Sequence, residues 1–185
     1  MRTNRSGESA LLLLDVADLL VAQKIEYAVI GALAASVHGA VRASMDADVV
    51  LSIGMGEAED LDRACKTAGF LTALTRGDLE DPIPGLLRLG DIYDNRVDLL
   101  IGLRGLEPQA FSRGVDVPFQ GRTLKFIGRE DFVAMKVFAG GPMDLIDASR
   151  AVSAAGASLD FKLARRLAGR YGREALESLE RILAG

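Results

Sequence analysis

The chain has 185 residues, of which 49% are hydrophobic and 26% charged, so it is long enough to bury a sizeable core and falls outside the disordered class. Its single cysteine, Cys65, excludes an internal disulfide, and its single histidine, His38, excludes a histidine-rich metal site. The net charge of −4 gives no overall case for nucleic-acid binding. We expect a cytoplasmic protein of one domain, or of one domain with an appended helical part, in which oxygen ligands bind any metal.

Charge is distributed unevenly along the chain. Residues 1–121 hold 11 Lys or Arg and 18 Asp or Glu, a balance of −7, whereas residues 122–185 hold 11 and 8, a balance of +3. This division suits metal binding on one side and an anionic substrate on the other, although ordinary surface charge accounts for it equally well. No apolar run approaches the ~20 residues of a membrane span, and Asp15 and Asp18 interrupt the leucine-rich start, so we expect no membrane association.

The first predicted elements are two helices and two strands. Apolar residues at helical spacing predict an amphipathic helix over 8–23. Residues 27–30 are typical of a strand, Gly31-Ala32 of a turn, and residues 33–38 of a short helix. Residues 45–51 predict a second strand, because they are apolar and partly β-branched apart from two aspartates.

The middle of the chain predicts a helix, a loop and a hairpin. The helix covers 57–68, with acidic residues in its first turns and Cys65 as a small core residue. Two prolines favour a loop over 72–85, and apolar runs at 86–89 and 96–101 predict the two strands of the hairpin.

The remainder predicts a last strand pair and a helical end. The strands cover 115–119 and 124–127, and the helices cover 129–139, 142–154, a segment capped by Asp160, and 173–183. A soft boundary near Gly128 divides the chain into a core, 1–128, and a C-terminal helical segment, 129–185, packed on it.

Two aspartates mark the strand at 45–51 as a candidate metal site. Asp46 and Asp48 are two residues apart, so their side chains project from the same face of the strand. Neighbouring carboxylates repel unless a cation joins them or one takes up a proton, and Mg²⁺ prefers such oxygen ligands. The turn at Gly31-Ala32, between a strand and a helix, predicts a phosphate cradle of backbone N–H groups.

These residues resemble the nucleotidyltransferase superfamily, the polymerase-β-like fold. Its signature is hydrophobic-Gly-Gly/Ser, then about nine to thirteen residues, then Asp-hydrophobic-Asp/Glu-hydrophobic. This chain has Ile30-Gly31-Ala32, thirteen residues over 33–45, and Asp46-Ala47-Asp48-Val49. Ala32 departs from the signature, because alanine keeps the N–H group but lacks the hydroxyl donor of serine.

Within the superfamily, the stand-alone toxins of the AbiEii type are the most similar. They often carry Gly-x-x-Arg-x-Thr-x-Asp-hydrophobic-Asp, and this chain has Gly39, Arg42 and Ser44 before the aspartate pair. These toxins commonly have an acidic residue, an apolar helix with a central lysine, a turn, and an aspartate on the next helix. This chain has Glu130-Asp131 for the acidic residue, Lys136 for the lysine and Asp144 for the aspartate. The resemblance covers about residues 8–155.

The resemblance implies an α+β fold, with a small mixed sheet flanked by helices and a C-terminal helical segment. It also implies an Mg²⁺- or Mn²⁺-dependent transfer of a nucleoside monophosphate from an NTP to a hydroxyl acceptor. The metal-binding and catalytic carboxylates would be Asp46, Asp48 and Asp98. Asp98 is an aspartate inside the apolar strand predicted at 96–101. The implied nucleotide-binding residues are Gly31, Ala32, Arg42, Ser44, Lys136 and Asp144.

Several alternatives stay open. The acceptor would be tRNA or another RNA if the basic residues between Lys162 and Arg173 track phosphates, whereas a solvated helix face is the plainer interpretation. Because Ala32 weakens the cradle, the chain is alternatively an inactive nucleotide-binding protein, or a partner-binding half of a toxin–antitoxin pair. Arg42 is expected to hold a phosphate or to pair with Asp46, and Lys136 to contact the triphosphate or to reach the surface.

Overall fold

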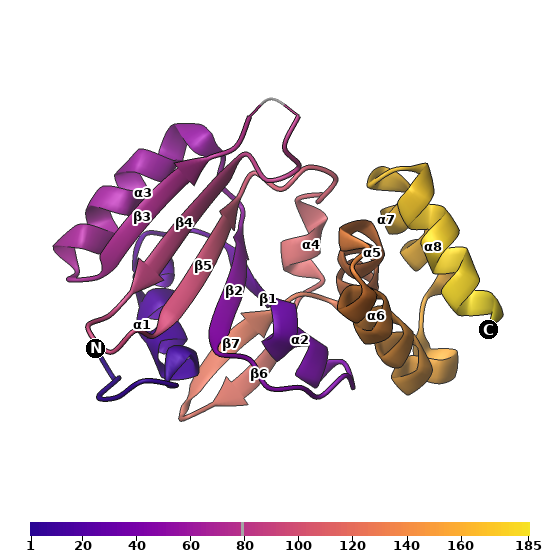
Figure 1. Ribbon diagram of the computed structural model, residues 1–185, viewed down its shortest axis with the longest axis horizontal. Helices are drawn as coiled ribbons and strands as arrows, with labels where there is room; N and C mark the ends of the chain where they lie inside the picture. Colours follow the sequence, from indigo (N-terminus) through magenta and orange to yellow (C-terminus); the bar gives the residue numbers. More distant parts are fainter. Residues whose placement is uncertain (79) are drawn as a thin grey trace.

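The structure is a computed structural model that describes residues 1–78 and 80–185. Within them, a seven-stranded sheet has the strand order β3-β4-β5-β2-β1-β7-β6, and a group of helices lies beyond one side of it (Figure 1). The strands are β1 (Tyr27–Ile30), β2 (Asp46–Leu51), β3 (Leu71–Arg76), β4 (Gly85–Gly90), β5 (Arg96–Ile101), β6 (Val115–Phe119) and β7 (Arg122–Phe126). The sheet is mixed, because β2 runs parallel to β5 and β1 to β7, whereas the other neighbours are antiparallel.

The helices flank this sheet and then gather at the C-terminus. They are α1 (Ser9–Ala22), α2 (Gly31–Val37), α3 (Met55–Thr67), α4 (Gln109–Ser112), α5 (Arg129–Ala139), α6 (Pro142–Ala155), α7 (Phe161–Arg170) and α8 (Arg173–Ala184), with a 3-10 turn at Gly156–Ser158. The fold class expected from the sequence, a mixed sheet flanked by helices with a C-terminal helical segment, is confirmed. Among the described residues, no helix combines the length and apolar character that a membrane span requires.

The register of the central strands decides which side chains share a row. Ile30 of β1 pairs with Asp48 of β2, Asp48 pairs with Asp98 of β5, and Asp98 pairs with Arg88 of β4. Because paired residues on neighbouring strands project from the same face, these four side chains form one row across the sheet. The strand alternation therefore brings together residues separated by up to 68 positions in the chain.

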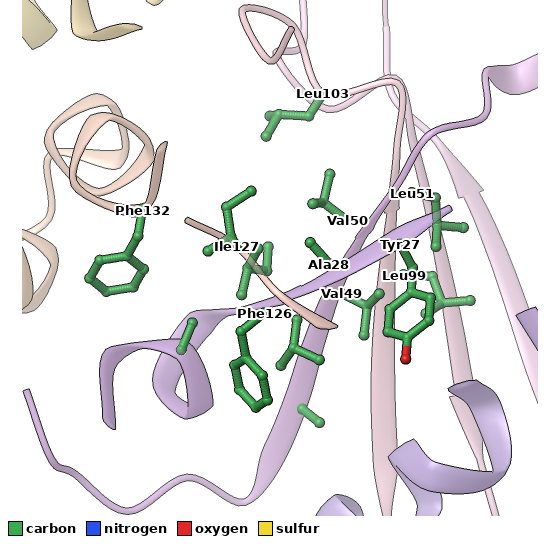
Figure 2. Close-up of a cluster of buried hydrophobic side chains, with 14 of the residues drawn as sticks. Tyr27, Ala28, Val49, Val50, Leu51, Leu99, Leu103, Phe126, Ile127 and Phe132 are labelled. Carbon is green, nitrogen blue, oxygen red and sulfur yellow. The ribbon is translucent and has the colours of Figure 1, made fainter. Parts of the chain in front are cut away.

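The two faces of the sheet have different roles. Val49, Leu99 and Leu87, which alternate with the charged row, are fully buried, and α1 and α3 pack against these strands. On the other face, Ile30 of β1, Asp48 of β2 and Leu100 of β5 line one cavity together with residues of α5. Figure 2 shows part of the core, which contains side chains from β1, β2 and β5. It also contains Phe126 and Ile127, at the end of β7, and Phe132, on α5.

The C-terminal helices begin and end as their sequences predict. Acidic residues occupy the first turn of α5, which ends at Gly140 in the left-handed conformation. Pro142 occupies the first turn of α6, and the Asp160 carboxylate accepts a hydrogen bond of 2.9 Å from the Leu163 N–H at the start of α7. Buried residues of α5–α8 belong to the same hydrophobic cluster as the sheet, and a division at residue 128 stays a prediction.

A set of ion pairs joins the segment around α4 to this helical segment. We call Glu107, Arg113, Asp131 and Arg166 the clasp. Arg113 donates to both carboxylate oxygens of Asp131 at 2.7 Å and lies 2.7 Å from Glu107, whose other oxygen is 2.8 Å from Arg166. The clasp therefore connects the segment around α4 with α5 and α7.

The loop predicted over 72–85 is wrong in its first part, because residues 71–76 form the edge strand β3. Most of the β3 side chains are exposed, and the strand is held by its backbone pairing with β4. An edge strand that buries little apolar surface leaves only a weak hydrophobic pattern.

Candidate active site

The start of α2 packs directly on the carboxylate of Asp48. Gly31 follows β1 with a φ of +64°, and a Cβ atom added there would lie 1.9 Å from Asp48 Oδ2. Both the backbone conformation and the space therefore require glycine. Ala32, the departure from the family signature, is buried behind it. Binding of phosphate by the amides of this turn stays a prediction.

The acidic site, by which we mean Asp46, Asp48 and Asp98, brings like charges together on one face. Asp48 is half-buried at the centre, and Asp46 is exposed at the start of the same strand. Burial raises the pKa of the Asp48 carboxyl, Asp98 raises it further, Lys136 opposes the rise, and Asp46 adds to it. A carboxyl held in this way is suited to a cation partner.

The third carboxylate has a partner that sequence reasoning missed. Asp98 accepts two hydrogen bonds from Arg88, from Nε to Oδ1 at 2.8 Å and from Nη2 to Oδ2 at 2.9 Å. Arg88 interrupts the apolar run at 86–89, and the hairpin register places it opposite Asp98. A charged residue inside an apolar strand was the signal that marked Asp98, and it also applies to Arg88.

A divalent cation fits the chemistry of these three residues. Carboxylate oxygens are the ligands that Mg²⁺ and Mn²⁺ prefer, and the pKa of Asp48 is raised first by burial and then by the neighbouring carboxylate of Asp98. In the described parts of the chain, no three acidic, histidine or cysteine side chains stand close enough to enclose a metal ion, and Asp98 is engaged with Arg88. Asp46, Asp48 and Asp98 as metal ligands stay a prediction.

Lys136 is directed into the interior and does not reach the surface. Its residue is 8% exposed, and its Nζ lies 2.6 Å from Asp144 Oδ1 and 3.2 Å from Asp147 Oδ2. Arg42 does not pair with Asp46; its Nε lies 3.2 Å from the same Asp147 oxygen. Asp147 is fully buried, and one of its carboxylate oxygens pairs with both Arg42 and Lys136. It was absent from the predicted site, although its spacing of three residues from Asp144 on a helix places both on one face.

A cavity of about 450 Å³ opens beside these groups. Gly31, Asp48, Lys136 and Asp144 line its polar part. The remaining lining is apolar and comes from three regions: the sheet, the segments around Ile83 and Leu103, and α5. These apolar residues are Ile30, Pro82, Ile83, Leu100, Leu103, Phe132, Met135, Phe138 and Ala139. The cavity therefore combines a charged end with an apolar body, which is typical of sites for small organic ligands.

Ser44, His38 and Cys65 each have contacts within the fold. The Ser44 hydroxyl donates to the Asp46 carbonyl at 2.8 Å and so orders the start of β2. His38 Nε2 lies 2.8 Å from the Ile127 carbonyl oxygen, and the ring packs on Phe132. Cys65 is buried, and burial raises its pKa to about 12, which suits a core residue.

Solved structures with a similar fold cover most of this chain. ANT(2'')-Ia, crystallised with adenylyl-2''-tobramycin, aligns over 88% of this chain and 98% of its own, with 14% identity and a TM-score of 0.59. The lincosamide antibiotic adenylyltransferase LnuA, bound to lincomycin, aligns over 82% and 99%, with 13% identity and a TM-score of 0.51. An antigenic nucleotidyltransferase-like protein from Paracoccidioides brasiliensis aligns over 98% and 90%, with 14% identity and a TM-score of 0.57.

The structural comparisons identify the fold of this chain. The mixed sheet and the helical segment beside it form a nucleotidyltransferase fold, the fold of these structural neighbours. At such low identity the likeness concerns the fold alone. No protein-family model matches the chain, and no curated protein matches it either.

Proposed function

We propose that the protein transfers a nucleoside monophosphate from an NTP to a hydroxyl group of a small molecule, with Mg²⁺ or Mn²⁺ as cofactor. One observation carries the proposal: Asp48 packs against the turn at Gly31, lies in one row with Asp98, and shares a cavity with Lys136. A carboxylate for metal (Asp48), a cation for phosphate (Lys136) and an apolar pocket thus lie at one place.

The residues divide the work of this reaction. Asp46, Asp48 and Asp98 would hold the divalent cation, which when bound supplies positive charge to the triphosphate and lowers the pKa of the acceptor hydroxyl. Lys136 is held by Asp144 and Asp147 at the cavity, where it contacts the triphosphate as a point charge. The acceptor oxygen attacks the α-phosphorus, pyrophosphate leaves, and Asp98 takes the hydroxyl proton.

A small acceptor is favoured over RNA by the pairing of the basic residues. The arginines that would track RNA phosphates are engaged within the protein: Arg165 with Glu180, Arg166 with Glu107, Arg170 with the Gly105 carbonyl, and Arg173 with Glu177. Two structural neighbours also have small antibiotics or their adenylyl products in the names of their structures. The apolar body of the cavity suits such a compound.

The resemblance to AbiEii-type toxins stays a prediction that rests on the motif between Gly39 and Asp48. An antitoxin partner and a catalytically inactive site belong with it as alternatives. Metal-dependent nucleotide binding without turnover would favour the inactive alternative.

The test uses each α-³²P-labelled NTP with Mg²⁺ and either the small-molecule or the RNA fraction of a cell extract. With the wild type, we expect one or more NTPs to give a labelled small-molecule product that is distinct from the NTP itself. We expect no such product with Asp48→Asn. Label in RNA would overturn the proposed acceptor class while keeping the reaction. No transfer to any fraction would contradict the proposed activity.

A further inference from the structure

Arg88 occupies the carboxylate that the proposed function needs for metal. Its fork donates one hydrogen bond to each oxygen of Asp98, and the two residues are directly paired across β4 and β5. A bidentate pair of this kind neutralises the carboxylate and fixes its orientation. In the described residues the acidic site therefore does not converge on one point, although its three members share one face.

The influence of Arg88 extends beyond Asp98. The hydrogen bonds from Asp98 raise the pKa of the Arg88 guanidinium, and the charge of Asp46 contributes to the same rise. The guanidinium thus lies in the electrostatic field of two of the three carboxylates. A divalent cation bound there would face an adjacent positive charge that it must displace or repel.

We propose that Arg88 is an internal counter-ion that competes with a divalent cation for Asp98 and so sets the metal concentration at which the acidic site fills. This inference rests on the proposed function, because it takes Asp98 as a metal ligand. The side chain of Arg88 is 50% exposed, so it has room to leave Asp98 for solvent when the cation arrives. Arg88 is a positioning residue, since it acts through Asp98.

The chain provides a matched control. Arg96 stands two residues before Asp98, pairs in register with Asp46, and has a side chain that is 46% exposed. It forms its ion pair with Asp94 at 2.7 Å and not with the acidic site. Arg96→Gln therefore removes the same charge from the same neighbourhood without freeing Asp98.

The experiment is a titration with Mn²⁺ alone, with free Mn²⁺ measured by electron paramagnetic resonance. We expect Arg88→Gln to lower the Mn²⁺ dissociation constant about three- to fivefold, near the upper end for a partly exposed ion pair, and Arg96→Gln to change it by less than about twofold. Arg88→Gln combined with Asp98→Asn should lose the gain. Circular dichroism checks that each variant is folded.

The outcomes separate this inference from the proposed function. If the wild type binds Mn²⁺ through Asp48 and Arg88→Gln binds it equally or more weakly, the competition is overturned and the proposed function stands. If Arg88→Gln binds Mn²⁺ where the wild type does not, the competition is supported. If neither protein binds Mn²⁺, the metal-dependent function fails, and the inference fails with it.

Discussion

The acidic site and the clasp both assemble charged residues from distant parts of the chain, but they balance charge in opposite ways. In the clasp, Arg113 and Arg166 satisfy Glu107, and these hydrogen bonds lower the pKa of Glu107 to about 2. In the acidic site, burial and neighbouring carboxylates raise the pKa of Asp48. The clasp therefore lowers the free energy of the folded state, whereas the buried charge of Asp48 raises it.

This difference separates a structural cluster from a functional one. Two arginines hold Glu107 within the fold, whereas the Asp48 carboxylate, buried beside other carboxylates, has a stabilising interaction with a cation still to make. The comparison can be broken by neutralising one group in each cluster and measuring both stability and activity.

The largest effect is expected from Asp48→Asn. Because the neutral amide is a weaker ligand for a divalent cation than the carboxylate, we expect the rate of nucleotide transfer to fall about 1,000-fold or more, equivalent to about 4 kcal/mol of transition-state stabilisation. The melting temperature should stay unchanged or rise, since a destabilised buried charge is removed. Thermal unfolding and a transfer assay measure both; a clear loss of stability would contradict the comparison.

The matching change in the clasp is Arg113→Met. It leaves the buried carboxylate of Asp131 and that of Glu107 without their shared partner, and breaking a buried ion pair costs about 3–5 kcal/mol. We expect a loss of unfolding free energy of that order, measured by urea denaturation. Stability close to that of the wild type would show that the clasp does not hold the segment around α4 to helices α5 and α7.

The third prediction concerns acid. The pKa of Glu107 is lower in the folded protein than its ordinary value of 4.5, so its contribution is fully present above pH 4.5 and is lost as pH falls towards about 2. We expect stability to decline over this window and Glu107→Gln to reduce the decline by about 2–3 kcal/mol. Urea midpoints at several pH values test this, and an equally steep decline in the variant would refute it.

The smallest effect is expected from metal alone. Mg²⁺ or Mn²⁺ at about ten times its dissociation constant stabilises the native state by about 1.4 kcal/mol, or roughly 3–6 °C in a chain of this size. Asp46→Asn, Asp48→Asn and Asp98→Asn should each reduce the shift. Equal shifts in the wild type and all three variants would remove the shared metal site.

Sequence reasoning located the acidic residues because strand alternation and a local motif need no long-range information. It did not find Arg88, whose role depends on the β4–β5 register, or Asp147, whose burial depends on how α5 and α6 pack. The β3 strand was missed for a related reason, since an edge strand is fixed by backbone pairing. What stayed hidden was therefore set by tertiary contacts rather than by local pattern.

The central claim is that the acidic site and the cavity beside it bind an NTP. Calorimetric titration with a nonhydrolysable NTP and Mg²⁺ tests it, with Asp116→Asn as a control, because Asp116 is an exposed carboxylate paired with Lys125 on β7. We expect Mg²⁺-dependent binding to the wild type and to Asp116→Asn, weakened about tenfold or more, or 1.4 kcal/mol, in Asp48→Asn. Equal binding by all three proteins, or none by the wild type, would contradict the account.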